Sequence, residues 1–90
     1  MIIKMKSKIP NVKITDCKAN YDGSITIDPI LMRGYNIVPY EQVHVLGVTS
    51  KERCITYAIE GKEGEICCNG GLANIFNVGD VVNIVSYKIE

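Results

Sequence analysis

Four cysteines and a single histidine are the residues of this 90-residue chain whose types most readily suggest nucleophilic or metal chemistry. His44 has no serine or cysteine at a spacing typical of a catalytic pair, so a partly exposed strand position is the better interpretation. The cysteines form no C-x-x-C motif, and the adjacent pair Cys67-Cys68 would make a poor tetrahedral clip for zinc. Nothing in the sequence suggests export, so we expect free thiols and no metal site.

Two further segments contain groups that can react or bind anions. Asp22-Gly23-Ser24 places a hydroxyl next to a dipeptide that favours tight turns. Residues 53–57, Arg-Cys-Ile-Thr-Tyr, place a guanidinium, a hydroxyl and a phenol on one short segment. Taken alone, the first predicts a hairpin turn and the second a strand with a polar face. Any chemistry must therefore be inferred from the two segments together with the rest of the chain.

The elements that must position these groups are short strands separated by turns. Alternating apolar residues predict a strand over 11–19, joined through Asp22-Gly23 in a hairpin to a second strand over 24–27. Asp28-Pro29 supplies an N-cap and a first-turn proline, which predicts a short helix over 30–33. Further strands are predicted over 42–48, 53–59, 65–68 and 81–87, with a helical turn over 72–76. This pattern indicates a mainly β domain, a small barrel whose closure protects its edges.

The composition narrows the classes of function. Ninety residues make one domain, and 47% hydrophobic against 22% charged residues is more apolar than such a domain needs, which favours oligomerisation. Lys plus Arg and Asp plus Glu both number 10, so the chain lacks the excess of positive charge that phosphate binding requires. We therefore expect no nucleic-acid partner. No apolar run approaches the roughly 18 to 20 residues of a membrane span, and no signal peptide follows Met1. We expect a cytoplasmic protein with no membrane partner.

Several segments together resemble the pyruvoyl-dependent aspartate 1-decarboxylases. The segments follow the order of that family at nearly its spacing, from about Lys8 to Tyr87. They are Lys8, Val12-Lys13-Ile14-Thr15, Tyr21-Asp22-Gly23-Ser24, Ile27-Asp28, Val48-Thr49, Arg53 with Thr56-Tyr57-Ala58-Ile59, Asn69-Gly70 and Val78-Gly79-Asp80-Val81-Val82. The resemblance implies that residues 1–90 form a single domain, a six-stranded double-psi β-barrel with short helical turns.

The resemblance also implies a cofactor made from the chain itself. The Ser24 hydroxyl would attack the Gly23 carbonyl, the chain would break between these two residues, and a pyruvoyl group would remain at position 24. No metal or diffusible cofactor is implied. Gly23 suits this step because a residue without Cβ permits a strained turn, and Thr56 matches the hydroxyl that stabilises the oxyanion. Tyr57 matches the proton donor of the decarboxylation. Neighbouring strand residues point to opposite faces, so either the backbone bends at Thr56-Tyr57 or the two residues serve different sites.

The substrate implied by the resemblance is L-aspartate, converted to β-alanine and CO₂ for pantothenate and coenzyme A synthesis. Arg53 and Lys8 match the cations that bind its two carboxylates. Backbone N–H groups of Asn69-Gly70-Gly71 would face an anionic oxygen, and Tyr21 would line the same pocket. The resemblance further implies a homotetramer with active sites between subunits.

Some positions depart from the family pattern. Pro10 replaces a basic or polar residue, Leu72 replaces a small residue, and the connection over 61–65 is shorter than usual. Typical members also continue well beyond Tyr87, so we expect assembly to differ. Two other functions stay open: a related pyruvoyl decarboxylase for another acidic amino acid, and an unprocessed non-enzymatic barrel that acts as an assembly module. Maturation is compatible with either spontaneous cleavage or cleavage assisted by a helper protein.

Overall fold

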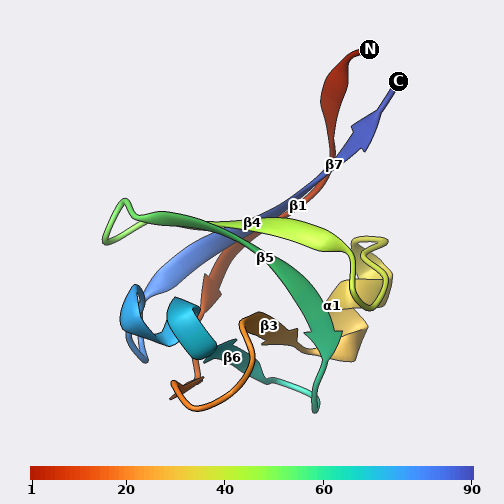
Figure 1. Cartoon of the computed structure of the whole chain (residues 1–90). Helices are drawn as coiled ribbons and strands as arrows, with labels where there is room; N and C mark the ends of the chain where they lie inside the picture. Colours follow the sequence, from red (N-terminus) through yellow and green to blue (C-terminus); the bar gives the residue numbers. More distant parts are fainter.

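A computed structural model describes the whole chain, Met1–Glu90, and shows one mixed seven-stranded sheet with two short helices (Figure 1). The elements in chain order are β1 (Ile3–Lys13), β2 (Asp16–Lys18), β3 (Ser24–Ile27), α1 (Pro29–Gly34), β4 (Gln42–Gly47), β5 (Arg53–Glu60), β6 (Ile66–Asn69), the 3₁₀ helix η1 (Gly70–Asn74) and β7 (Val81–Ile89). The order of strands in the sheet is β1-β7-β4-β5-β3-β6-β2. Neither helix is long and apolar enough to cross a membrane.

The two end strands of the sheet, β1 and β2, are consecutive in the chain, and the sheet curls to bring them together. Only Ile14 and Thr15 separate β1 from β2, and their backbone N–H groups continue the pairing of β1 with β7 and of β2 with β6. The N–H of Ile14 donates to the Asp80 carbonyl at 2.9 Å, and the N–H of Thr15 donates to the Ile66 carbonyl at 2.8 Å. This arrangement brings the two end strands together through the chain, as in a small barrel, and confirms the predicted mainly β fold.

The beginning of the chain differs from its prediction. The strand expected over 11–19 is divided between β1, which starts earlier at Ile3, and the three-residue β2. Asn11 has a positive φ of 55° at an irregularity in the β1–β7 register, and its N–H donates to Asn83 Oδ1 at 2.9 Å. The division raises the number of strands from the predicted six to seven.

The predicted hairpin between β2 and β3 is wrong. These strands do not pair with each other, because β6 lies between them, parallel to β2 and antiparallel to β3. Two strands that flank a third and are hydrogen-bonded to it form a ψ motif, so the turn at Asp22-Gly23 crosses over β6. The other predicted strands are confirmed within two residues, as is the short helix, whereas η1 begins two residues before the predicted turn.

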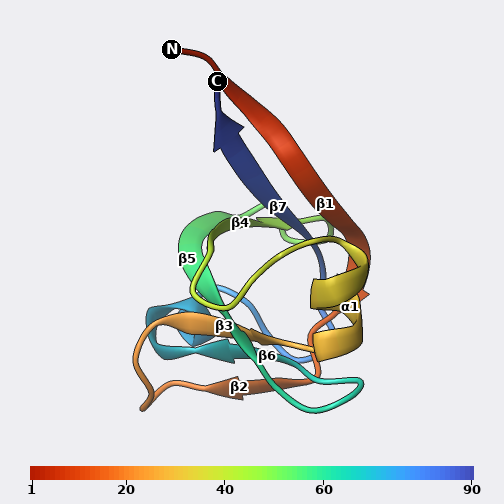
Figure 2. The ribbon, with the colours of Figure 1, turned by 90° about the vertical axis from the view of Figure 1, so that its right-hand side faces the viewer.

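Strands β1 and β7 extend together beyond the body of the sheet as a two-stranded arm (Figures 1 and 2). Their pairing continues to Ile3 opposite Ile89, and both chain termini lie at the tip of this arm. Six large apolar side chains of the arm are exposed: Met1, Ile2, Ile3, Met5, Tyr87 and Ile89. An apolar surface of this kind is typical of a contact with another protein.

Helix α1 is joined to the short connection between β5 and β6 through Asp28. The Asp28 carboxylate accepts from the N–H of Ile30 at 2.7 Å, which caps the helix, and from the N–H of Gly64 at 2.8 Å. Both bonds lower the pKa of the Asp28 carboxyl, and the bond from Gly64 has the larger effect. The connection over 61–65 is thereby fixed to the helix.

Strands β3 and β6 are buried on both faces, since all four residues of each are buried. Their inward face belongs to the hydrophobic core, with Ile25, Ile27 and Cys68 fully enclosed. Their other face contains Ser24, Thr26 and Asn69, which are also buried. Buried polar side chains need hydrogen-bond partners, so this second face must contain a polar network.

Candidate active site

Ser24 is held at the boundary between an exposed turn and a buried strand. Its side chain begins β3 and is only 3% exposed, whereas Asp22 and Gly23 just before it are exposed. Asn69, directly opposite on β6, donates from Nδ2 to Ser24 Oγ at 2.9 Å. Ser24 Oγ in turn donates to the carbonyl of Asp22 at 3.3 Å. The hydroxyl is thus fixed next to the peptide bond that the sequence predicts to break.

The Asn69 amide connects Ser24 with Thr26 and Cys67, which no sequence motif assigns to the site. Its Nδ2 also donates to Thr26 Oγ1 at 2.9 Å, and its Oδ1 accepts from the Cys67 thiol at 3.3 Å. Burial raises the pKa of the Cys67 thiol, which keeps it protonated and able to donate. No short motif links these residues, because they meet only through the pairing of β3 with β6.

Gly70 supports the turn that precedes Ser24. It has a positive φ of 66°, and a Cβ at this position would lie 2.7 Å from the Tyr21 carbonyl oxygen and 2.8 Å from the Gly23 nitrogen and Cα. Gly71 has no such role, since a Cβ there would meet no atom within 4 Å. Of the two predicted glycines, only Gly70 is packed against the turn.

Gly70→Ala is therefore expected to destabilise the fold by about 2 kcal/mol or more, because left-handed backbone strain adds to a clash with backbone atoms that cannot rotate away. Urea unfolding measures the change. Gly71→Ala is the matched control and should change the free energy of unfolding by less than about 0.5 kcal/mol. Equal stability of the two variants would contradict the close packing of Gly70 against residues 21–23.

Tyr57 lies beside Ser24, and Thr56 does not face it. Strand β3 runs parallel to β5, with Ile25 opposite Ala58. One position earlier on each strand, Ser24 and Tyr57 are neighbours on the same face of the sheet. Thr56 lies opposite Val43, which is fully buried, and therefore belongs to the inner face. The pairing of β5 with β4 is regular from Arg53 to Tyr57, so the backbone does not bend to bring both hydroxyls to one side.

The two predicted cations are far from Ser24 within one chain. Arg53 is exposed on the same face as Tyr57, about 13 Å away along the strand at the usual rise per residue. Lys8 is exposed on β1, which is separated from β3 by β7, β4 and β5 in one direction around the sheet and by β2 and β6 in the other. Outward side chains of a closed sheet also point away from one another. Within one chain, Lys8 is thus separated from Ser24 by at least two strands.

A polar cleft of about 410 Å³ opens next to the Ser24 network. Asn69 and Thr26 form part of its wall, and so does Tyr21, whose ring is 64% exposed and lies 5.4 Å from the Lys18 ammonium. Lys18 lines the cleft as well, and the remaining lining residues are Ile59, Glu60, Gly61, Lys62 and Glu65. Two lysines and two glutamates give the cleft both signs of charge, which suits a small zwitterionic ligand.

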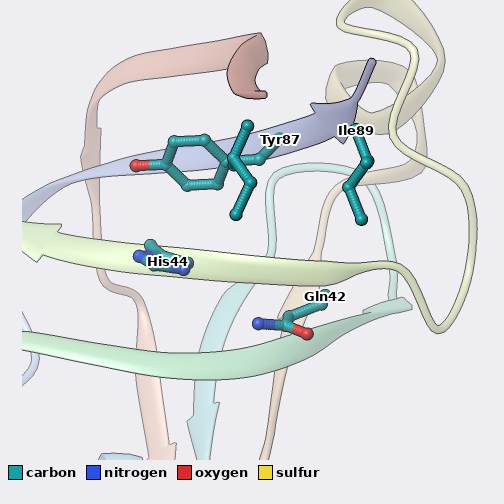
Figure 3. Close-up of a pocket in the computed structure, with 5 residues that line it drawn as sticks. Gln42, His44, Tyr87 and Ile89 are labelled. Atoms are coloured by element: carbon teal, nitrogen blue, oxygen red, sulfur yellow. The ribbon is translucent and has the colours of Figure 1, made fainter. Parts of the chain in front are cut away.

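A second cavity, of about 330 Å³, lies where the arm leaves the sheet (Figure 3). It is lined by Ile3, Gln42, His44, Tyr87 and Ile89, and the half-buried His44 ring packs edge-on against Tyr87 with 4.7 Å between ring centroids. No lysine, arginine or carboxylate lines this cavity. It is therefore less suited than the Ser24 cleft to a dicarboxylic substrate.

Comparison with known proteins identifies the family. The sequence profile described as "Aspartate decarboxylase" matches residues 1–90. Proteins named "Aspartate 1-decarboxylase" from Campylobacter curvus and Thermoanaerobacter pseudethanolicus are 48% and 49% identical over 83 and 87 residues, which cover 92% and 94% of this chain and 72% and 74% of theirs. One from Dehalococcoides mccartyi is 48% identical over 87 residues, 94% of this chain and 70% of its own. The buried serine behind an exposed Asp-Gly turn thus occurs in a chain that belongs to the aspartate decarboxylase family.

Proposed function

We propose that this protein decarboxylates L-aspartate to β-alanine and CO₂, a reaction that supplies pantothenate and coenzyme A synthesis in the cytoplasm. The observation that carries the proposal is the placement of Ser24. Its hydroxyl is buried and bonded to Asn69, the β3–β5 register continued by one position places Tyr57 on the same face, and the preceding Asp22-Gly23 turn is exposed. Family membership and relatives named for this reaction support the same activity.

The reactive group would be a pyruvoyl group that the chain makes from Ser24. Ser24 Oγ attacks the Gly23 carbonyl carbon, the C–N bond between the two residues breaks, and the Oγ proton passes to the freed amine. The resulting ester then loses the Ser24 Cα proton and breaks at Cβ–Oγ, which releases Gly23 as a carboxylate. Addition of one water and loss of ammonia leave the pyruvoyl group at the start of residues 24–90.

The surroundings of position 24 fit such a group. A pyruvoyl group has acceptor oxygens and no donor, and the Asn69 amide directs an N–H donor toward position 24, from which Oγ leaves with Gly23. A Cβ on Gly23 would meet no atom within 4 Å, so the turn has room to separate after cleavage. Once formed, the group supplies an electron-withdrawing carbonyl for a substrate amine.

The other predicted residues have separate roles in binding and turnover. Arg53 and Lys8, the latter from a neighbouring copy, bind the two carboxylates of aspartate. Tyr57 holds the proton that replaces the departing CO₂ on the substrate α-carbon. Thr56, on the inner face, stabilises the oxyanion of cleavage only if the turn moves toward it. Tyr21, Asn69, Gly70 and Gly71 complete the surroundings of the substrate.

Mass spectrometry of the purified, denatured protein tests the proposal together with an assay of CO₂ release. The expected products are residues 1–23 and residues 24–90, the latter with a borohydride-reducible ketone, and aspartate should be preferred to glutamate. An intact chain after prolonged incubation, with no CO₂ release, would favour the non-enzymatic barrel. Cleavage only after addition of cell extract would indicate a helper protein, and preference for glutamate would identify the related decarboxylase.

We also propose a homotetramer with active sites between subunits. The separation of Lys8 from Ser24 and the exposed apolar residues of the arm support this assembly. Co-expression of a Lys8→Ala chain with a Ser24→Ala chain tests it, because each variant retains the residue that the other lacks. Random pairing predicts recovery of about a quarter of wild-type activity in mixed oligomers, whereas each variant alone stays inactive. Mixed oligomers without recovered activity would contradict a shared site.

A further inference from the structure

The Asn69 amide has one orientation that satisfies all of its polar atoms. In this orientation both hydrogens of Nδ2 have hydroxyl acceptors, on Ser24 and Thr26, and Oδ1 accepts from the Cys67 thiol. Asn69 is 3% exposed, so water does not replace a missing partner. The three neighbours therefore determine which end of the amide faces Ser24.

Cys67 and Thr26 are the residues that make the reverse orientation unfavourable. Hydroxyl groups both donate and accept, so Ser24 alone would tolerate either end of the amide. After a flip, the two hydrogens of Nδ2 would face Cys67, whose sulfur is only a weak acceptor, and one buried hydrogen would lack a partner. Cys67 thus keeps Asn69 Oδ1 directed at its thiol, and Thr26 Oγ1 accepts from the second Nδ2 hydrogen on the opposite side.

We propose that Cys67 and Thr26 are positioning residues for the conversion of Ser24, because they keep Asn69 Nδ2 directed at Ser24 Oγ. The inference rests on the proposed self-cleavage and extends it to a particular step. During elimination the Cβ–Oγ bond breaks and Oγ takes the electron pair as part of the Gly23 carboxylate, while the Cα proton passes to solvent water. An N–H donor 2.9 Å from Oγ stabilises this negative charge as it develops. A flipped amide would place its carbonyl oxygen against the same atom and repel it.

Two pairs of variants separate this role from simple packing. Cys67→Ala removes the thiol donor and Cys67→Ser retains a donor, while Thr26→Val removes the acceptor and Thr26→Ser retains it. Cleavage into residues 1–23 and 24–90 is followed by mass spectrometry of the denatured chain. Loss of one hydrogen bond predicts cleavage about five- to tenfold slower for Cys67→Ala and Thr26→Val, and within about twofold of wild type for the two serine variants. Thermal unfolding establishes that each variant is folded.

The intermediate gives a readout that packing alone would not change. If the amide acts at elimination, the ester between Gly23 and Ser24 should accumulate in Cys67→Ala and Thr26→Val, and hydroxylamine should release residues 1–23 as a hydroxamate. Equal cleavage rates in wild type and Cys67→Ala would overturn the inference, as would equal slowing in Cys67→Ala and Cys67→Ser or slow cleavage without ester. A wild-type chain that stays intact would overturn the proposed function itself, and this inference with it.

Discussion

Ser24→Ala is expected to yield an intact 90-residue chain that releases no CO₂ from aspartate. The variant lacks the hydroxyl that attacks the Gly23 carbonyl, so neither the chain break nor the pyruvoyl group can form. The loss of activity should be complete, to the detection limit of the assay, because Ser24 is the residue from which the proposed pyruvoyl group is made. Mass spectrometry of the denatured protein and CO₂ release measure the two effects in the same sample.

The control for this variant is Ser50→Ala. Ser50 is exposed in the turn between β4 and β5, where its Oγ accepts from the N–H of Glu52 at 3.3 Å. Its removal should change neither cleavage nor turnover. Ser24→Ala also leaves one Asn69 hydrogen without its partner, at a cost of about 1 to 3 kcal/mol, so thermal unfolding must show that the variant is folded. A folded Ser24→Ala protein that still decarboxylates aspartate would refute the pyruvoyl mechanism.

Local sequence patterns predict most strands of this fold but not how they pair. Local apolar and β-branched patterns between turns predict β3, β4, β5 and β7, since such patterns depend only on residues that follow one another in the chain. Two strand patterns joined by the turn at Asp22-Gly23 predict a hairpin. The actual partner of both strands is β6, more than forty residues away from β2, and no local signal reports such a contact. The first part of β1 was missed for the same reason, because its partner β7 is at the other end of the chain.

The candidate site shows the same division between local and distant information. Sequence motifs point to Ser24, Gly70 and Asn69, and the structure brings these residues together at the start of β3. The opposite faces of Thr56 and Tyr57 follow from strand geometry alone. Cys67 and Thr26 could not be predicted, because their bonds to Asn69 depend on the register of β3 against β6. The distance from Lys8 to Ser24 likewise depends on the order of strands in the closed sheet.

The position of Tyr57 predicts a separation between maturation and turnover. Tyr57→Phe should cleave at Gly23-Ser24 at the wild-type rate, because the network around Ser24 consists of Asn69, Thr26 and Cys67 and does not include the phenol. The processed variant should decarboxylate aspartate about 10²- to 10⁴-fold more slowly, since it lacks the O–H that returns a proton to the substrate α-carbon. The KM for aspartate should change little, because the ring stays in place.

Tyr40→Phe is the matched control for this change. The Tyr40 ring lies 6.0 Å from that of Tyr57, but Tyr40 is largely exposed in the turn before β4. Loss of its hydroxyl should leave kcat within about twofold of wild type, as expected for an exposed group that has no role in the proposed proton transfer. Steady-state CO₂ release from fully processed samples measures kcat for both variants. If Tyr57→Phe turns over at the wild-type rate, the proton must come from another group or from water. If it fails to cleave, Tyr57 acts in the formation of the pyruvoyl group, and the division of labour between Tyr57 and the Asn69 network is wrong.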